Sequence, residues 1–463
     1  MSELHGHLFP GDHDEHGAVL GVTVVRTTRG TRLLARRLFL ARDGIDYVPG
    51  DRGYRLLTPE FVSDRILDCQ EEGLGYLAIH CHGGTDNVGF SEVDLASHLR
   101  GYQALLDILD GPPVGGLVFA HAAVAGDLWL PGGDRIELAH LDVVESPQRR
   151  LTPSPTRRPE GADTNYDRQA RLFGDRGQAL LHQQKVAVVG AGGAGSLVVE
   201  YLARLGVGEI VVIDHDRMNR VNLPRVVGSR RRDVRPWLTN ECCPNWLRKL
   251  GERLATKKVD VARRVALEAN PAIRFHAIAK KVTDPAAARE LVGSDYIFLA
   301  ADTMLARLVV NAAVHQYLVP GVQLGAKAQV DPKSGEVLEV FSVVRSLIPG
   351  ITCLWCNGLI PSAKLQEEAT SDEQRKRQRY VDDDDIPAPS VITLNAVAAA
   401  HAVDDYMFQV TGLRQKSDVW WPVYEPRSND ITFDIPRRDV DCHYCSARLA
   451  TGDLARLPTE MLG

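Results

Sequence analysis

The clearest hydrophobic pattern in the chain lies between residues 185 and 213. Val186–Val189 is a short apolar run, which is typical of a buried strand. Apolar residues then recur at helical spacing from Ser196 to Leu205, and Glu209–Ile213 is a second short apolar run. A strand, a helix and a strand in this order predict a parallel βαβ unit within an α/β fold.

The turn between the first of these strands and the helix is rich in glycine. Glycine allows a sharp backbone turn and lets phosphate oxygens approach, and the helix N-terminus offers free N–H groups and a partial positive charge. Asp214 ends the second strand, where an acid suits a ribose hydroxyl. The segment therefore predicts a nucleotide site, and the glycines of its turn are Gly190, Gly192, Gly193 and Gly195.

The rest of the pattern separates an N-terminal region from the nucleotide-binding region. In the first 145 residues, Val19–Val25 and Tyr76–Ile79 are predicted strands, and Pro59–Glu72 is a predicted helix. Residues 147–162 contain four prolines and four arginines without apolar periodicity, which predicts a linker. Beyond the βαβ unit, Asp295–Ala301 is another predicted buried strand.

Composition limits the class of protein and its partners. The chain has 463 residues, which is enough for two or three domains, and its net charge of −6 implies no nucleic acid or other polyanion as partner. The first residues lack the apolar centre of a signal peptide, and no apolar run of about 18 residues suggests a membrane span. Four of the eight cysteines form two C-x-x-C pairs, which suits a metal in a reducing cytoplasm.

Three features narrow the type of nucleotide enzyme. The glycine turn has a doubled glycine, a second acid (Asp216) follows Asp214, and Asn222 and Arg225 form an N-x-x-R motif. This stretch resembles the ThiF/MoeB-like family of ubiquitin-activating enzymes, which adenylate the C-terminal glycine of a ubiquitin-like protein. An NAD-dependent dehydrogenase, the alternative interpretation, has no use for a second acid and an arginine at these positions.

The resemblance implies roles for several residues in binding ATP and Mg²⁺. Besides the glycine turn, Asp214, Asp216, Asn222 and Arg225, it implies that Lys258 contacts phosphate, with Lys257 as the alternative. It also implies that Asp302, after the strand at 295–301, lies near the α-phosphate and Mg²⁺. Arg168, within N-Y-D-R-Q, would reach the ATP of the other subunit of a homodimer. The alternative for Arg168 is an ordinary arginine on an exposed helix.

The two C-x-x-C pairs predict a structural zinc site. Four thiolates in two tight pairs form a closed tetrahedral site with no open position, so this zinc is not expected to be catalytic. Four free thiols are the alternative. The pairs are Cys353 with Cys356 and Cys442 with Cys445.

The family resemblance is incomplete at the catalytic thiol. Residues 364–385 are dense in charge and resemble the loop that lies over the ubiquitin-like tail in this family, yet residues 357–441 contain no cysteine. Three interpretations remain. The enzyme stops at the acyl adenylate, a partner supplies the thiol, or Cys242 or Cys243 acts after a loop movement. The first two are favoured, because adjacent loop cysteines are more often incidental.

A second group of candidate residues lies in the N-terminal region. His80 and His82 alternate along an extended segment, so both imidazoles face the same side. Asp94 follows 12 residues after His82, on a helix that we expect to begin at Ser91. Two imidazoles and one carboxylate are a common catalytic zinc set that leaves a position for water. Glu15, just before the first predicted strand, is a candidate general base, with Asp14 and Glu3 as the alternatives.

This constellation resembles the JAB/JAMM metalloprotease family. The resemblance implies that His80, His82 and Asp94 bind a catalytic zinc ion, that Glu15 deprotonates the zinc-bound water, and that Ser91 stabilises the oxyanion. The alternative is a β-hairpin with surface histidines, because the chain contains 15 histidines and a second H-x-H pair near its start.

The two resemblances together cover nearly the whole chain. They imply an α/β JAMM-like peptidase domain at 1–150, a linker at 151–162, and a Rossmann-like, doubly wound ThiF-type domain at 163–463. The predicted function is ATP-dependent adenylation of a ubiquitin-like protein, with zinc-dependent cleavage after its C-terminal glycine, in a bacterial conjugation system of the antiphage defence type. A conjugating enzyme is a further candidate partner. Activation and trimming of a sulfur carrier, and a scaffold with decayed sites, are the alternatives.

Overall fold

The structure of the protein is a computed structural model that describes residues 1–12, 14–50, 55–155, 164–331, 334–369, 389–415 and 418–461. The chain folds into two compact units. The first comprises Met1–Val143, Gln148–Arg157 and Ala450–Ala455, and the second comprises the remainder. The segment Ala450–Ala455 therefore belongs with the N-terminal unit, although the sequence suggested that residues 163–463 form one domain.

The first unit is built on a six-stranded sheet in the order β2-β1-β3-β4-β5-β6. Neighbouring strands are antiparallel, except that β3 and β4 run parallel. The two strands and the helix predicted in this region are present as β1, β3 and α2. Their ends lie within two residues of the predicted limits. The strands are β1 Gly17–Thr27, β2 Gly30–Leu40, β3 Gly75–Cys81, β4 Val114–Phe119, β5 Val124–Trp129 and β6 Arg135–Glu137.

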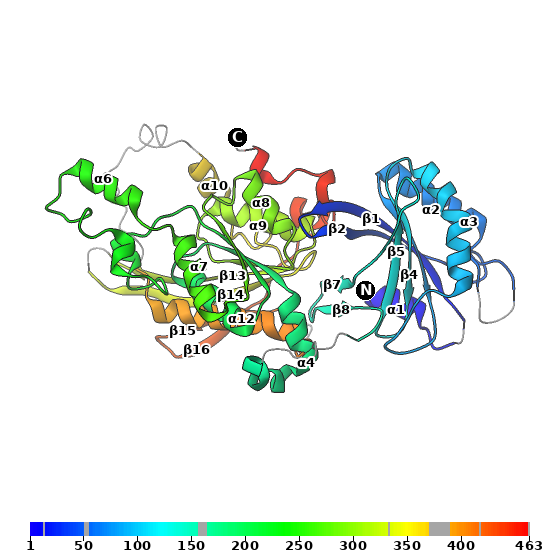
Figure 1. Ribbon diagram of the computed structural model, residues 1–463, viewed down its shortest axis with the longest axis horizontal. Coiled ribbons are helices and arrows are strands. Elements are labelled where there is room, and N and C mark those ends of the chain that lie inside the picture. Colours follow the sequence, from blue (N-terminus) through cyan, green and yellow to red (C-terminus); the bar gives the residue numbers. More distant parts are fainter. Residues whose placement is uncertain are drawn as a thin grey trace. The chain divides into compact units, whose positions relative to one another are not determined.

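Helices cover both faces of this sheet (Figure 1). The helices α2 (Pro59–Glu72) and α3 (Glu92–Leu109) pack on one face, while α1 (Ser2–Leu8) contributes Leu4 and Leu8 to the core on the other. The proline- and arginine-rich segment is not entirely an open linker, because Arg149–Leu151 forms β8 and pairs with β7 (Leu141–Val143).

The second unit is built on an eight-stranded sheet in the order β11-β10-β9-β12-β13-β14-β15-β16. The first five strands are parallel, and the last three are added antiparallel. The strands are β9 Lys185–Val189, β10 Glu209–Ile213, β11 Arg274–Ile278, β12 Tyr296–Leu299, β13 Gly321–Val330, β14 Val337–Leu347, β15 Trp421–Glu425 and β16 Asp430–Asp434.

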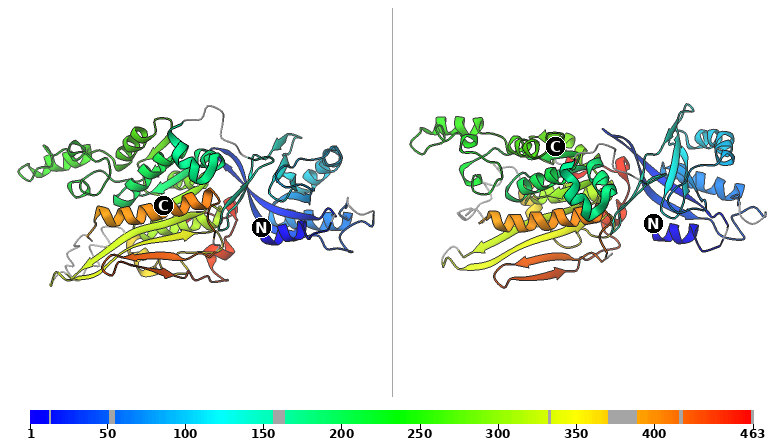
Figure 2. Two further views of the ribbon diagram at one scale, coloured as in Figure 1. Left: turned by 90° about the horizontal axis from the view of Figure 1, so that it is seen from below. Right: turned by 60° about the horizontal axis from the view of Figure 1, so that its bottom comes forward.

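Helices also cover both faces of the second sheet. One face carries α5 (Gly193–Leu205), α7 (Lys258–Ala269) and α12 (Ile392–Val410), and Figure 2 shows α12 in orange along the yellow strands β13 and β14. The opposite face carries α8 (Pro285–Val292) and α9 (Met304–Gln316). This is the Rossmann-like architecture that the apolar runs predicted. The other α-helices in the described residues are α4 Asp167–Gln183, α6 Asn245–Leu254 and α10 Ser362–Ala369.

The strand order determines where a ligand can enter the second unit. The chain passes from β9 to β10 and β11 on one side, and then crosses to β12 on the other side of β9. The connections leave the carboxyl ends of β9 and β12 in opposite directions, which opens a crevice where ligands bind in such sheets. Among the described residues, no helix combines the length and apolar character that crossing a membrane would require.

Candidate functional site

The glycine turn lies at this crevice, and its glycines serve different purposes. Gly190 has a φ of +96°, and a Cβ there would lie 2.9 Å from the Ala301 backbone nitrogen, beyond β12. A Cβ on Gly195 would lie 1.9 Å from the Gly190 carbonyl oxygen. A Cβ on Gly192, which precedes α5, would meet no other atom within 4 Å. Gly190 and Gly195 therefore shape the turn, whereas Gly192 leaves open space beside the helix N-terminus.

The Asp214 carboxylate stabilises the backbone of the glycine turn. One carboxylate oxygen accepts a hydrogen bond from the Ala191 N–H at 2.7 Å, and the other accepts from the Asp216 N–H at 2.8 Å. Each oxygen retains a second lone pair for a ribose hydroxyl. Asp214 is thus both a structural support of the glycine turn and a candidate ribose ligand.

Asp216 and Lys258 form a half-buried ion pair at the same edge of the sheet. Their side chains lie 2.7 Å apart, and the Lys258 N–H also donates to the Asp216 carbonyl oxygen at 3.0 Å. Burial opposes ionisation of Asp216, but the Lys258 ammonium outweighs it and lowers the pKa of that carboxyl. The pair presents one cation and one carboxylate, which suits phosphate together with a divalent cation.

Asn222 and Arg225 belong to the segment that follows Asp216, and its backbone comes close to the glycine turn at Arg225. Asn222 is buried, and its side-chain oxygen accepts a hydrogen bond from the Asn219 N–H at 3.1 Å. The Asn219 side-chain oxygen in turn accepts from the Asn222 N–H at 3.1 Å, so Asn222 mainly stabilises the local turn at residues 219–222. A Cβ on Gly193 would come within 3.6 Å of the Arg225 carbonyl oxygen and 2.3 Å of the Asn395 side chain on α12. The sequence did not single out Asn395, because nothing local in helix α12 indicates that it reaches the glycine turn.

Asp302 is exposed in the loop after β12, one residue beyond Ala301. The next helix, α9, is capped in two ways: Thr303 accepts from the Ala306 N–H, and Glu368 of α10 accepts from the Met304 and Leu305 N–H groups at 2.9 Å. Glu368 was not predicted, and residues 364–369 form part of α10 instead of a charged loop. The rest of the predicted loop, 370–385, lies outside the described residues.

Within the described residues, no contact joins Arg168, Cys242 or Cys243 to the nucleotide crevice. Arg168 is exposed in the first turn of α4, and its role in a homodimer stays a prediction. Cys242 is exposed, and the Cys243 thiol donates to the Trp237 carbonyl oxygen at 3.6 Å. A role for either cysteine in a thioester likewise stays a prediction.

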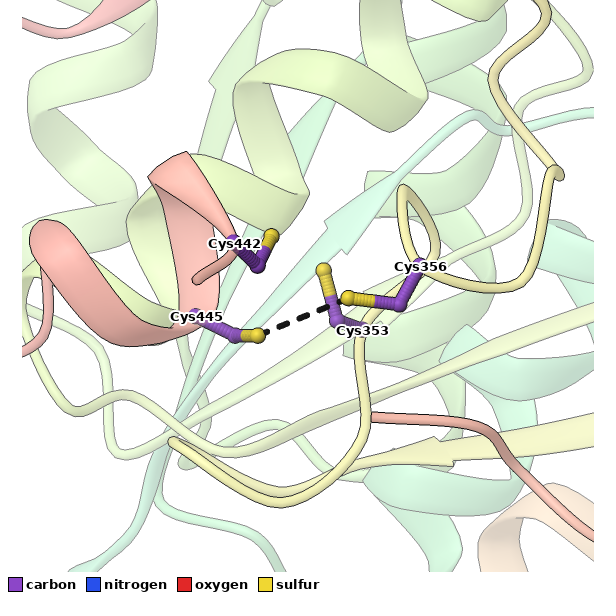
Figure 3. Close-up of side chains that lie close together, drawn as sticks. All are labelled: Cys353, Cys356, Cys442 and Cys445. Carbon is purple, nitrogen blue, oxygen red and sulfur yellow. Dashed lines mark hydrogen bonds between the residues drawn. The ribbon is translucent and has the colours of Figure 1, made fainter. Parts of the chain in front are cut away.

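The second C-x-x-C pair meets the first in space. Figure 3 shows Cys353 and Cys356 on the loop after β14 facing Cys442 and Cys445 on a helical turn near the C-terminus. All four sulfurs lie within 4.8 Å of one another, and Cys356 and Cys445 are 3.6 Å apart. Tetrahedral zinc with Zn–S bonds of about 2.3 Å places sulfurs about 3.8 Å apart. The cluster therefore fits a closed zinc site.

The surroundings of this cluster also suit a metal. Asn311 of α9 donates to the Cys353 sulfur at 3.4 Å, which is the kind of support that orients a metal ligand. Burial raises the pKa of the Cys353 thiol to about 12, so the thiol is neutral without a cation nearby. A bound metal would reverse this, because a coordinating thiol is deprotonated.

In the first unit, His80, His82 and Asp94 converge. His80 lies on β3, His82 follows it, and Asp94 lies in the first turn of α3. Each imidazole Nε2 is 3.4 Å from an Asp94 oxygen. A tetrahedral zinc ion with bonds of about 2.0 to 2.1 Å would hold such atoms about 3.3 Å apart. The buried His80 Nε2 also makes no hydrogen bond, so these three residues fit a metal ion.

Glu15 and Ser91 surround this cluster. The pairing of Gly17 with His80 brings Glu15 beside the histidines, with its carboxylate 4.0 Å from His82 Nε2. Burial raises the pKa of Glu15, although the two histidines partly oppose this. Ser91 caps α3, and its hydroxyl donates to an Asp94 oxygen at 2.8 Å. In this arrangement Ser91 orients Asp94, and an oxyanion role would require that bond to break.

Comparison with known protein families gives the family of the second unit. Residues 166–406, just over half of the chain, match the model of the ThiF family. The chain belongs to the ThiF family. The residues of the nucleotide crevice, from Gly190 to Asp302, all lie within the ThiF match, whereas His80, His82 and Asp94 of the first unit lie outside it.

Two curated relatives are similar to part of this chain. The SAMP-activating enzyme E1 of Haloferax volcanii is 28% identical over 205 residues, which cover 43% of this chain and 64% of the relative. The sulfur carrier protein adenylyltransferase of Thermus thermophilus is 33% identical over 150 residues, which cover 32% of this chain and 48% of the relative. The chain thus matches less than two thirds of either relative. Among solved structures, Escherichia coli MccB with succinimide aligns at 20% identity and a TM-score of 0.46, covering 61% of this chain and 75% of MccB.

Proposed function

We propose that the protein adenylates the C-terminal glycine of a ubiquitin-like protein with ATP and Mg²⁺, and that its first unit is a JAMM-type zinc peptidase that cleaves after that glycine. The adenylation proposal rests on the crevice between β9 and β12. There the glycine turn, Asp214, the Asp216–Lys258 pair and Asp302 lie at neighbouring strand ends of a ThiF domain.

In adenylation, the substrate carboxylate attacks the α-phosphate of ATP, the bond to the β-phosphate oxygen breaks, and pyrophosphate leaves. The N–H groups at the start of α5 and the open space at Gly192 would receive phosphate oxygens. Asp214 would bind ribose, while Lys258 and Arg225 would balance the phosphate charge. Asp216 and Asp302 offer carboxylate oxygens to Mg²⁺. Arg168 would complete the site from a second subunit.

In peptide cleavage, His80, His82 and Asp94 would hold a zinc ion that lowers the pKa of its bound water. Glu15 would take the proton from that water and pass it to the leaving amine, for which its raised pKa is suitable. Ser91 would keep Asp94 oriented. The four-cysteine cluster would hold a second zinc ion with a structural role.

A second candidate function is activation of a sulfur carrier. Its support is the similarity of part of the chain to a sulfur carrier protein adenylyltransferase. The chemistry at the crevice would be the same, and only the fate of the acyl adenylate would differ. A bacterial ubiquitin-like conjugation system, with a conjugating enzyme as additional partner, is the pathway we favour.

Pyrophosphate exchange tests the adenylation proposal. We expect label to pass from pyrophosphate into ATP only when a ubiquitin-like protein with a free C-terminal glycine is added. Asp302→Ala should reduce exchange about a hundredfold or more, because it removes a candidate Mg²⁺ ligand. Lack of exchange with every carrier tried would refute adenylation, and the carrier that supports exchange would separate the two candidate pathways.

Cleavage of a carrier extended beyond its glycine tests the peptidase proposal. Glu15→Gln keeps the shape of the side chain but cannot accept the proton, so we expect cleavage to fall about a hundredfold or more. The two variants are matched controls: Glu15→Gln should retain exchange, and Asp302→Ala should retain cleavage. Cleavage that persists in Glu15→Gln would rule out this base.

A further inference from the structure

Two arginines lie next to the nucleotide crevice without a carboxylate in contact. Arg307 is in the first turn of α9, and its guanidinium donates to the Leu359 carbonyl oxygen at 2.9 Å. Arg345 is on β14, donates to the Gln323 side chain at 2.7 Å, and lies 5.9 Å from the centre of the Trp421 ring. Within the described parts of the chain, neither forms an ion pair within 4 Å.

The register of the sheet places Arg345 near the end of β12, and Asp302 and Arg307 follow that end along the chain. Gln323 of β13 pairs with Leu299, the last residue of β12, on one side and with Arg345 on the other. Side chains alternate along a strand, and the neighbours Tyr296 and Phe298 face Tyr406 of α12. Leu299, Gln323 and Arg345 therefore face the opposite side of the sheet, which α9 covers.

Among the described residues, the carboxylates that act on these two arginines do so only from beyond contact distance. The Nε atoms of both arginines are buried and make no hydrogen bond. Burial first, and then the nearby charge of Arg307, lower the pKa of Arg345 to about 10, and the charge of Asp434 on β16 opposes this shift from beyond contact distance. Burial also lowers the pKa of Arg307. The charges of Asp302 and Glu368 oppose this shift, but neither carboxylate is in contact with the guanidinium. Glu368 itself is bound to the N-terminus of α9.

Two like charges in a half-buried position cost free energy unless an anion neutralises them. Guanidinium groups bind carboxylates and phosphates through paired N–H donors, and each of these arginines still has such donors unused. Of the anions in the proposed reaction, the phosphates already have the glycine turn and Lys258. The substrate carboxylate has no other cation assigned to it.

We propose that Arg307 and Arg345 form a carboxylate-binding subsite that receives the free C-terminus of the protein substrate before adenylation. The inference rests on the proposed function for the identity of the ligand. Binding of the terminal carboxylate would place its oxygens beside Asp302, at the end of β12 where the α-phosphate would lie. The arginines act here as binding groups, and no bond is made or broken.

Binding of two synthetic peptides to the full chain, without ATP, tests this subsite. One fluorescein-labelled peptide ends in Gly-Gly with a free carboxylate, and the other is identical but carries a C-terminal amide. By fluorescence anisotropy, we expect the wild type to bind the free acid about tenfold more tightly than the amide. Arg345→Gln should remove most of this preference. Arg263→Gln, an exposed arginine on α7, is the matched control and should retain it.

A thermal unfolding midpoint for each variant separates binding from a structural role. Gln at position 345 still offers an N–H group to Gln323 and removes one of two like charges, so the midpoint of Arg345→Gln should not fall. A lowered midpoint together with an unchanged preference for the free acid would mean that Arg345 only supports the fold, which would overturn the proposal.

Three other results would also overturn it. These are equal binding of acid and amide by the wild type, absence of binding at millimolar peptide, and an affinity for inorganic pyrophosphate that depends on Arg345 while peptide affinity does not. The last would assign the arginines to phosphate. A wild type that prefers the free acid but shows no pyrophosphate exchange would refute adenylation and leave the subsite in place.

Discussion

At the scale of single residues, several side chains take on more than the role that sequence suggests. Asp214 was expected to bind ribose, and it also bonds the backbone of the glycine turn through Ala191. Ser91 was expected to stabilise an oxyanion, and it caps α3 and orients Asp94. In both cases a short polar side chain satisfies backbone N–H groups that would otherwise lack partners.

His315 allows a prediction about pH at this scale. It is fully buried in α9, and its Nδ1 accepts a hydrogen bond from the Gly350 N–H at 3.1 Å, which requires the neutral ring. Burial lowers the pKa of His315 to about 3. In the unfolded chain its pKa is about 6.5, so the unfolded state binds the proton first as pH falls. His315 should therefore destabilise the fold by about 2 kcal/mol between pH 7 and pH 5.

The measurement is the urea midpoint as a function of pH for the wild type and for His315→Asn. Asparagine can still accept the Gly350 hydrogen bond but does not titrate, so its midpoint should fall less between pH 7 and pH 5. Parallel curves for the two proteins would show that His315 does not carry this dependence.

At the scale of elements, the glycine turn and helix α5 together form the candidate phosphate-binding segment. The turn is rigid because Gly190 needs a positive φ and lies against the backbone beyond β12. The helix α5 then starts beside the open space at Gly192. The two glycines therefore allow a comparison between loss of fold and loss of ligand binding.

Gly190→Ala should destabilise the ThiF domain by about 1 to 3 kcal/mol, because alanine is strained at this φ and its Cβ would approach the Ala301 nitrogen. Gly192→Ala should fold normally, since nothing lies within 4 Å of the added methyl group, but should weaken ATP binding. Thermal unfolding with and without ATP checks both variants. Normal ATP binding by a stable Gly192→Ala protein would contradict the placement of the phosphates.

At the scale of the whole molecule, the described residues include one candidate zinc site in each unit, besides the group of Asp214, His215 and Asp216 at the nucleotide crevice. One offers two imidazoles and a carboxylate, and the other offers four thiols. Only the first leaves room for a water molecule in a tetrahedral geometry. The two clusters should therefore respond differently to removal of metal.

We expect two zinc ions per chain by elemental analysis. Cys442→Ser should lose one of them and lower the unfolding midpoint of the ThiF domain, because a structural metal stabilises the fold that holds it. His80→Ala should lose the other zinc ion and leave the midpoint of that domain unchanged. If the wild type contains one zinc ion and the His80→Ala variant retains it, the proposed zinc site of the first unit is excluded.

The sequence by itself determined the local features of this protein. The apolar runs at β9, β10 and β12, the glycine turn and the limits of α2 follow from periodicity and from the conformational freedom of glycine, which act over a few neighbouring residues. The residue types of both candidate zinc sites were also recognisable, because ligand chemistry depends on the side chains themselves.

Only the tertiary structure decided which distant residues meet. The register of β1 against β3 brings Glu15 to His82, and packing of the C-terminal turn joins the two cysteine pairs. The same holds for Glu368 at the start of α9, Asn395 at the glycine turn, and Arg345 in the region of Arg307. Such contacts depend on strand pairing and on the packing of helices against sheets, and local sequence patterns carry no information about partners so far along the chain.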